Sequence, residues 1–101
     1  LQGSLPTTIS ARAVELTDTI CRKIQVDKSL TLAIIKETEY YLKLREVGEN
    51  PTQQYYREKE NFKSGRSSGN KGLTAAQRKA YIKALYKICL HISHKFRVML
   101  P

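Results

Sequence analysis

The chain has 101 residues, of which 41% are hydrophobic, and it carries a formal net charge of +9. This length suffices for one modest core and therefore for a single domain. No apolar run approaches the roughly 20 residues that a membrane helix needs, which excludes a membrane-spanning protein. The charge is asymmetric, because the first 50 residues hold seven basic and seven acidic side chains, whereas residues 61–101 hold nine basic and no acidic ones. A surface of one sign favours polyanionic partners.

The N-terminal part is predicted to consist of a short tail and one amphipathic helix. Residues 1–6 are expected to be disordered or tag-derived, since residues 1–4 resemble the remnant of a cleaved tag. Residues 7–101 then form a single helical domain. A first helix is predicted over residues 9–24, because apolar side chains recur there at helical spacing: Ile9, Ala13, Leu16, Ile20 and Ile24. Thr7 or Thr8 can cap its start.

A second helix is predicted to begin near Asp27 or Ser29 and to end at Gly48, which can adopt the left-handed conformation of a C-terminal cap. Its main apolar arc comprises Leu30, Ala33, Ile34, Tyr40, Tyr41, Leu44 and Val47, and a second strip holds Ile35 and Leu42. Two strips indicate two neighbours and hence a central helix. Glu37 falls within the main arc. We expect a salt bridge from it to a basic side chain, because an unpaired buried carboxylate is costly.

The middle of the chain gives a weaker helical pattern. A short helix over residues 51–63 would be held by only Tyr55, Tyr56 and Phe62. Residues 64–72 are rich in glycine and serine and are predicted to form a flexible basic loop.

The last segment gives the strongest helical pattern. Thr74 and Gln77 have the spacing of a capping box, which predicts a helix that runs to about Met99. Its buried face is expected to comprise Tyr81, Leu85, Ile88, Cys89, Ile92 and Phe96. No segment shows a strand pattern. The predicted fold class is all-α, a small helical bundle of three main helices plus one short helix, with a long basic C-terminal helix.

Basic residues occupy the other face of this last helix. Lys79, Lys83 and Lys87 follow one another at i, i+4 spacing, which brings like charges together and destabilises the helix unless a polyanion or a carboxylate relieves them. Phosphates would do so. Tyr86 lies at the border of the two faces, where a ring can stack on a base, and Tyr55 and Tyr56 are further stacking candidates. The predicted nucleic-acid-binding residues are Arg66, Lys71, Lys79, Lys83, Lys87, His91, His94, Arg97 and Tyr86.

These patterns predict a non-enzymatic nucleic-acid-binding module that contacts the phosphate backbone through the basic helix and loop. The charge pattern does not distinguish RNA from DNA, or single strands from duplexes. The alternative is a protein–protein interaction domain, a subunit or adaptor that docks on an acidic or helical partner. Such a domain would expose an apolar patch, formed by Ile35, Leu42, Val98 and Leu100.

Other chemistry is not indicated. Cys89, His91 and His94 have the spacing Cys-x-His-x-x-His, but on a helix the thiol points away from both imidazoles, so no metal site is predicted. No cofactor, small-molecule substrate or enzymatic activity is expected, because no convergent set of titratable groups is present. Cys21 and Cys89 are predicted to be buried, reduced thiols, which indicates an intracellular protein, cytoplasmic or nuclear.

Overall fold

A computed structural model describes residues 8–67 and 70–99, with side chains up to residue 94. The described residues form four α-helices and one 3₁₀ turn, and no strand: α1 (Ile9–Lys23), η1 (Lys28–Leu30), α2 (Thr31–Glu46), α3 (Pro51–Ser64) and α4 (Ala75–Met99). The predicted all-α class and small helical bundle are confirmed. The tail predicted at residues 1–6 lies outside the described residues.

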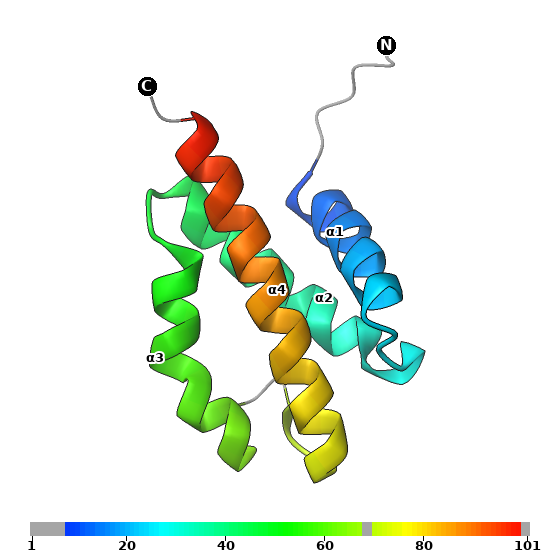
Figure 1. Ribbon diagram of the computed structural model, residues 1–101. Helices are drawn as coiled ribbons and strands as arrows, with labels where there is room; N and C mark the ends of the chain where they lie inside the picture. The colour runs from blue at the N-terminus through cyan, green and yellow to red at the C-terminus, as the bar shows by residue number, and fades with distance from the viewer. Residues whose placement is uncertain (1–7, 68–69, 100–101) are drawn as a thin grey trace.

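Helix α4 lies across the molecule with α3 on one side and α1 on the other, and α2 passes behind it (Figure 1). The first turn of α1 and the last turn of α4 are at the same end of the bundle. Helix α3 has 14 residues and is nearly as long as α1, with 15. It is therefore a full member of the bundle rather than a short connecting segment.

The helices begin where local side-chain caps occur. Thr8 accepts a 3.0 Å hydrogen bond from the amide of Ala11 at the start of α1. Asn50 accepts from the amide of Thr52 at 2.9 Å, immediately before Pro51 opens α3. The expected capping box at α4 is present: the amide of Gln77 donates to the Thr74 hydroxyl at 3.1 Å, and the amide of Thr74 donates to the Gln77 side chain at 2.9 Å.

The core lies where α4 packs on the other helices. Its fully buried large side chains include Ile34, Tyr41, Phe62, Tyr81, Leu85 and Ile88. The predicted apolar arc of α2 was wrong at two positions, because Tyr40 is 41% exposed and Val47 is 74% exposed, whereas Leu42 is buried. Helix α2 ends at Glu46, so Val47 is only its C-cap residue. The buried face instead follows Ile34, Thr38, Tyr41 and Leu42.

Glu37 does not form the expected salt bridge with any side chain in the described ranges. Burial between the helices raises the pKa of its carboxyl group, and the negative charge of Glu58 on α3 raises it further. The bundle therefore accommodates Glu37 by favouring the neutral, protonated form of its carboxyl group and not by pairing the charged form with a cation.

The end of α3 is fastened to the start of α4. Gly65 caps α3 in the left-handed conformation, with φ 75°. Asn70, which is buried, donates to the carbonyl of Phe62 at 2.7 Å. Arg78 of α4 donates from Nε to the carbonyl of Lys63 at 3.1 Å. These contacts set the position of α3 against α4. The flexibility predicted for residues 64–72 stays a prediction, and residues 68–69 lie outside the described ranges.

Candidate nucleic-acid interface

A row of lysines runs along the solvent face of α4. Lys79, Lys83 and Lys87 are exposed and occupy successive turns, opposite the buried side chains of Tyr81, Leu85 and Ile88. None of the three forms an ion pair with another side chain in the described part of the chain. Their mutual repulsion is therefore not relieved within the bundle.

Helix α3 adds two lysines beside this row, and sequence reasoning missed both. Lys59 lies three residues after the exposed Tyr56 on α3, and Lys63 lies four residues after Lys59. This helical spacing places the three side chains along one edge of the helix. The Lys59 ammonium lies 5.8 Å from the centre of the Tyr56 ring, within the range of a cation–π contact. Lys63 lies within 3.9 Å of the Glu60 carboxylate, but both side chains are largely exposed. Tyr55, Tyr56 and Phe62 were together expected to hold this helix; Tyr55 and Phe62 are buried, whereas Tyr56 is 54% exposed and lies on the edge that carries the two lysines.

Three tyrosines form an aromatic cluster between α3 and α4. The ring centres of Tyr55 and Tyr56 are 5.2 Å apart, those of Tyr55 and Tyr86 5.6 Å, and those of Tyr56 and Tyr86 6.4 Å. Tyr55 is buried and cannot reach a ligand, Tyr86 is half-buried, and Tyr56 is 54% exposed. A hydrogen bond with the Tyr86 hydroxyl raises the pKa of the Tyr56 phenol. Of the three stacking candidates, Tyr56 is therefore the one most open to solvent.

A shallow basic hollow of about 270 Å³ lies where the end of α3 meets the start of α4. Its lining residues are Lys63, Ala75, Arg78, Lys79 and Ile82. The Arg78 side chain is held there by hydrogen bonds to two backbone carbonyls, those of Lys63 and Leu73, at 3.1 and 2.9 Å. Three cations thus converge on one concave surface, which is suited to an anion.

The remaining predicted residues are spread more widely. Arg66 is exposed and donates to the Ser64 hydroxyl at 3.0 Å, and Lys71 is exposed in the turn that follows Asn70. The side chain of Arg97 lies outside the described residues. His91 and His94 do not lie beside α3 with the lysines; they line a different part of the surface.

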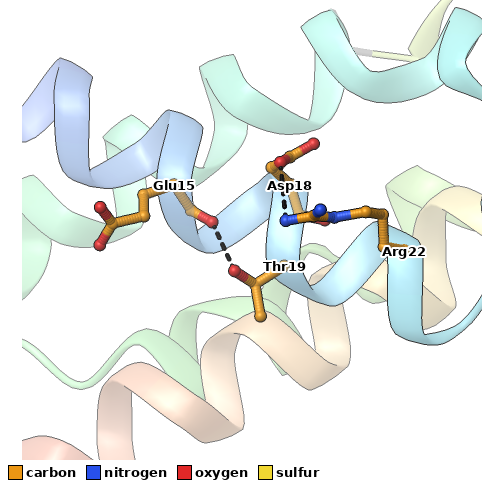
Figure 2. A network of polar contacts seen from close by, with 4 residues as sticks. All are labelled: Glu15, Asp18, Thr19 and Arg22. Atoms are coloured by element: carbon orange, nitrogen blue, oxygen red, sulfur yellow. Dashed lines mark hydrogen bonds and ion pairs between the residues drawn. The ribbon is translucent and has the colours of Figure 1, made fainter.

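The two histidines instead line a groove of about 750 Å³ between α1, the end of α2 and α4. Leu16, Leu42 and Ile92 give it an apolar floor, and its charged residues are of both signs: Arg12, Arg45, Glu15 and Glu46. Glu15 and Thr19 of α1 are among the residues that line this groove, and the Thr19 hydroxyl donates to the Glu15 carbonyl at 2.9 Å (Figure 2). The Arg22 guanidinium pairs with Asp18 at 3.1 Å along the same helix. Helix α1 thus carries charges of both signs, whereas α4 carries no acidic residue.

The cysteine of the Cys-x-His-x-x-His segment is separated from its histidines. Cys89 is fully buried in the core, whereas His91 and His94 are exposed. No group of three or more potential metal ligands occurs among the described residues. Cys21 and Cys89 are both free and buried, as predicted.

Comparison with protein-family models, with curated proteins and with solved structures finds no match to this chain. None of the helices within residues 8–67 and 70–99 combines the length and apolar character needed to cross a bilayer. The site therefore has to be interpreted from its own geometry and charge.

Proposed function

We propose that this chain is a non-enzymatic nucleic-acid-binding module whose contact surface is the seam between α3 and α4. We call this surface the basic seam and define it by Tyr56, Lys59, Lys63, Arg78, Lys79, Ile82, Lys83, Tyr86 and Lys87. The observation that carries the proposal is the unrelieved lysine row of α4, joined by the two lysines and the exposed tyrosine of α3.

The acidic residues of the bundle do not offset this charge. Residues 61–101 contain no acidic side chain. On α3, the Glu58 carboxylate lies close enough to Glu37 of α2 to raise the pKa of that group, and it accepts a 3.2 Å hydrogen bond from the Asn61 side chain. Among the described side chains, Glu60 is the only carboxylate that forms an ion pair with a residue of the seam, a 3.9 Å approach to Lys63 that is open to solvent and correspondingly weak.

Phosphate binding would relieve the repulsion between the lysines. Each lysine that neutralises a phosphate releases condensed counterions, so binding should be salt-sensitive and largely independent of sequence. The aromatic cluster adds a surface that a base can contact.

The test is fluorescence anisotropy with labelled single-stranded RNA, single-stranded DNA and duplex DNA, each over a range of salt concentrations. With about four phosphate contacts, the logarithm of the association constant should fall by about three units per decade of salt. Weak binding that does not respond to salt would overturn the proposal. That result would favour the alternative, in which the basic surface binds an acidic protein partner.

A further inference from the structure

We infer that the basic seam is built for a single strand rather than a duplex, with the Tyr56 ring as the platform for an unpaired base and the hollow of Lys63, Arg78 and Lys79 as the seat of a backbone phosphate. This inference rests on the proposed function and specifies its ligand class. It is carried by the exposed ring and by the concave cluster of cations at the far end of the same seam.

The Tyr56 ring is exposed but fixed in place. Its centre lies 5.2 Å from that of Tyr55 at an interplanar angle of 72°, and 6.4 Å from that of Tyr86 at 68°. Tyr55 is itself buried, so the support under Tyr56 is part of the core. A ring held in this way loses little conformational freedom when a base covers it.

A duplex would gain nothing from this ring. In double-stranded nucleic acid the base faces are stacked on one another, and the phosphates and groove edges are what a protein surface meets. A half-exposed tyrosine between lysines is covered only when an unstacked base lies on it, as in proteins that bind single strands. The Lys59 ammonium lies over the ring at 5.8 Å from its centre, so a base that stacks on that face would displace it, and the freed ammonium could then pair with the adjoining phosphate.

The hollow and the ring belong to one continuous track. On α3, Lys59 lies between Tyr56 and Lys63, and on α4, Ile82 lies between Tyr86 and Lys79. The two helices run antiparallel here, because Tyr56 contacts Tyr86 while Lys63 shares the hollow with Lys79. Tyr56 and Lys63 are seven helical steps apart, which is about 10 Å along α3, or about three stacked nucleotide steps. One short single strand can therefore contact both the Tyr56 ring and the hollow.

The test compares single-stranded RNA and single-stranded DNA with their duplexes at equal length and at moderate salt. Tyr56→Ala should weaken binding of the single strands about tenfold and leave duplex binding within about twofold, whereas Tyr56→Phe should retain full affinity. Tyr40→Ala is the matched control, since Tyr40 is also an exposed tyrosine, 41% accessible, but lies on α2. The Lys63→Ala/Lys79→Ala pair should lower the salt slope by about 1.5 for single strands.

A tryptophan at the same position gives a second readout that does not depend on the alanine variant folding. The chain has no tryptophan of its own, so Tyr56→Trp introduces a single indole emission. Single strands should quench this emission and duplexes should not, while Tyr40→Trp should respond to neither.

The outcomes separate the two proposals. Salt-dependent binding that is equal for single strands and duplexes, with Tyr56→Ala and Tyr56→Trp both unresponsive, would overturn this inference and leave the proposed function in place. Absence of binding to every ligand at low salt would overturn both. A difference between the RNA and DNA arms would identify which single strand the seam prefers.

Discussion

The hydroxyl of Thr17 on α1 donates a 3.0 Å hydrogen bond to the hydroxyl of Thr38 on α2, and both side chains are fully buried. The Thr38 hydroxyl in turn donates to the carbonyl of Ile34 at 2.8 Å. This chain of hydroxyls joins α1 to α2 inside an otherwise apolar contact. Every donor in it has an acceptor, as a buried polar group requires.

The two threonines should respond unequally to removal of the hydroxyl. Thr38→Val takes away the acceptor of Thr17 and should lower the free energy of unfolding by about 1–2 kcal/mol. Thr17→Val leaves Thr38 bonded to Ile34 and should lower it by less than about 0.5 kcal/mol. The double variant should be more stable than Thr38→Val alone. Urea denaturation followed by circular dichroism measures all three, and equal losses for the two single variants would contradict this account.

Glu37→Gln should stabilise the protein at neutral pH by about 1 kcal/mol, because it removes a buried charge that faces Glu58. The folded protein raises the pKa of Glu37 above its ordinary value of 4.5, so the folded state holds the proton more tightly than the unfolded chain does. The stability contributed by this group is therefore full below about pH 4.5 and falls as the pH rises toward the folded pKa.

Thermal unfolding measured over a pH series tests this relation. The wild-type protein should lose stability relative to Glu37→Gln as the pH rises above about 4.5, and the difference should level off once the pH exceeds the raised pKa of the folded state. Glu49→Gln, at an exposed position, is the control and should follow the wild type. A Glu37→Gln protein that is less stable than the wild type at neutral pH would show that the carboxylate has a favourable partner.

Charge reversal on α4 should remove nucleic-acid binding without unfolding the helix. Lys83→Glu/Lys87→Glu alters two exposed side chains and changes the net charge by four units. Affinity for nucleic acid should fall at least about a hundredfold, because two attractive phosphate contacts become repulsive. Lys28→Glu/Lys36→Glu makes the same change in net charge at exposed positions of η1 and α2. If both pairs weaken binding equally, overall charge rather than the basic seam is responsible.

The two cysteines should be unreactive in the native protein. Burial raises the pKa of the Cys21 and Cys89 thiols, so little of the reactive thiolate forms at neutral pH. Titration with a chromogenic disulfide reagent should detect two thiols in denaturant and reaction at least about tenfold slower without it. Rapid reaction of the native protein would place one of the thiols at the surface.

Local interactions explain which parts of the fold could be predicted from the sequence. The starts of α1 and α4 depend on Thr8 and on the Thr74–Gln77 pair, whose partners are three residues away, so their patterns are visible in the sequence itself. The face that α2 buries depends on its neighbours. The predicted main arc included Tyr40 and Val47, which are exposed, whereas Leu42 of the predicted second strip is buried.

The same distinction holds for the candidate site. The lysine row of α4 repeats within one helix and could be found by counting turns. The contribution of Lys59 and Lys63 could not be found in this way, because it depends on how α3 is placed against α4. That placement is fixed by hydrogen bonds from Asn70 and Arg78 to carbonyls of α3 that lie eight and 15 residues earlier in the sequence. His91 and His94 share a helix with the lysines, but α1 and α2 complete the groove that they line.

If the proposed function is correct, the anchoring of Arg78 has a consequence for the rate of association with an anionic ligand. Two backbone carbonyls hold the guanidinium before any anion arrives, so this charge needs no reorientation during an encounter. A lysine at this position would keep the charge but has no planar fork with which to satisfy both carbonyls. The arginine therefore presents a preorganised positive charge in the hollow, and under the proposed function this would favour rapid association with an anion.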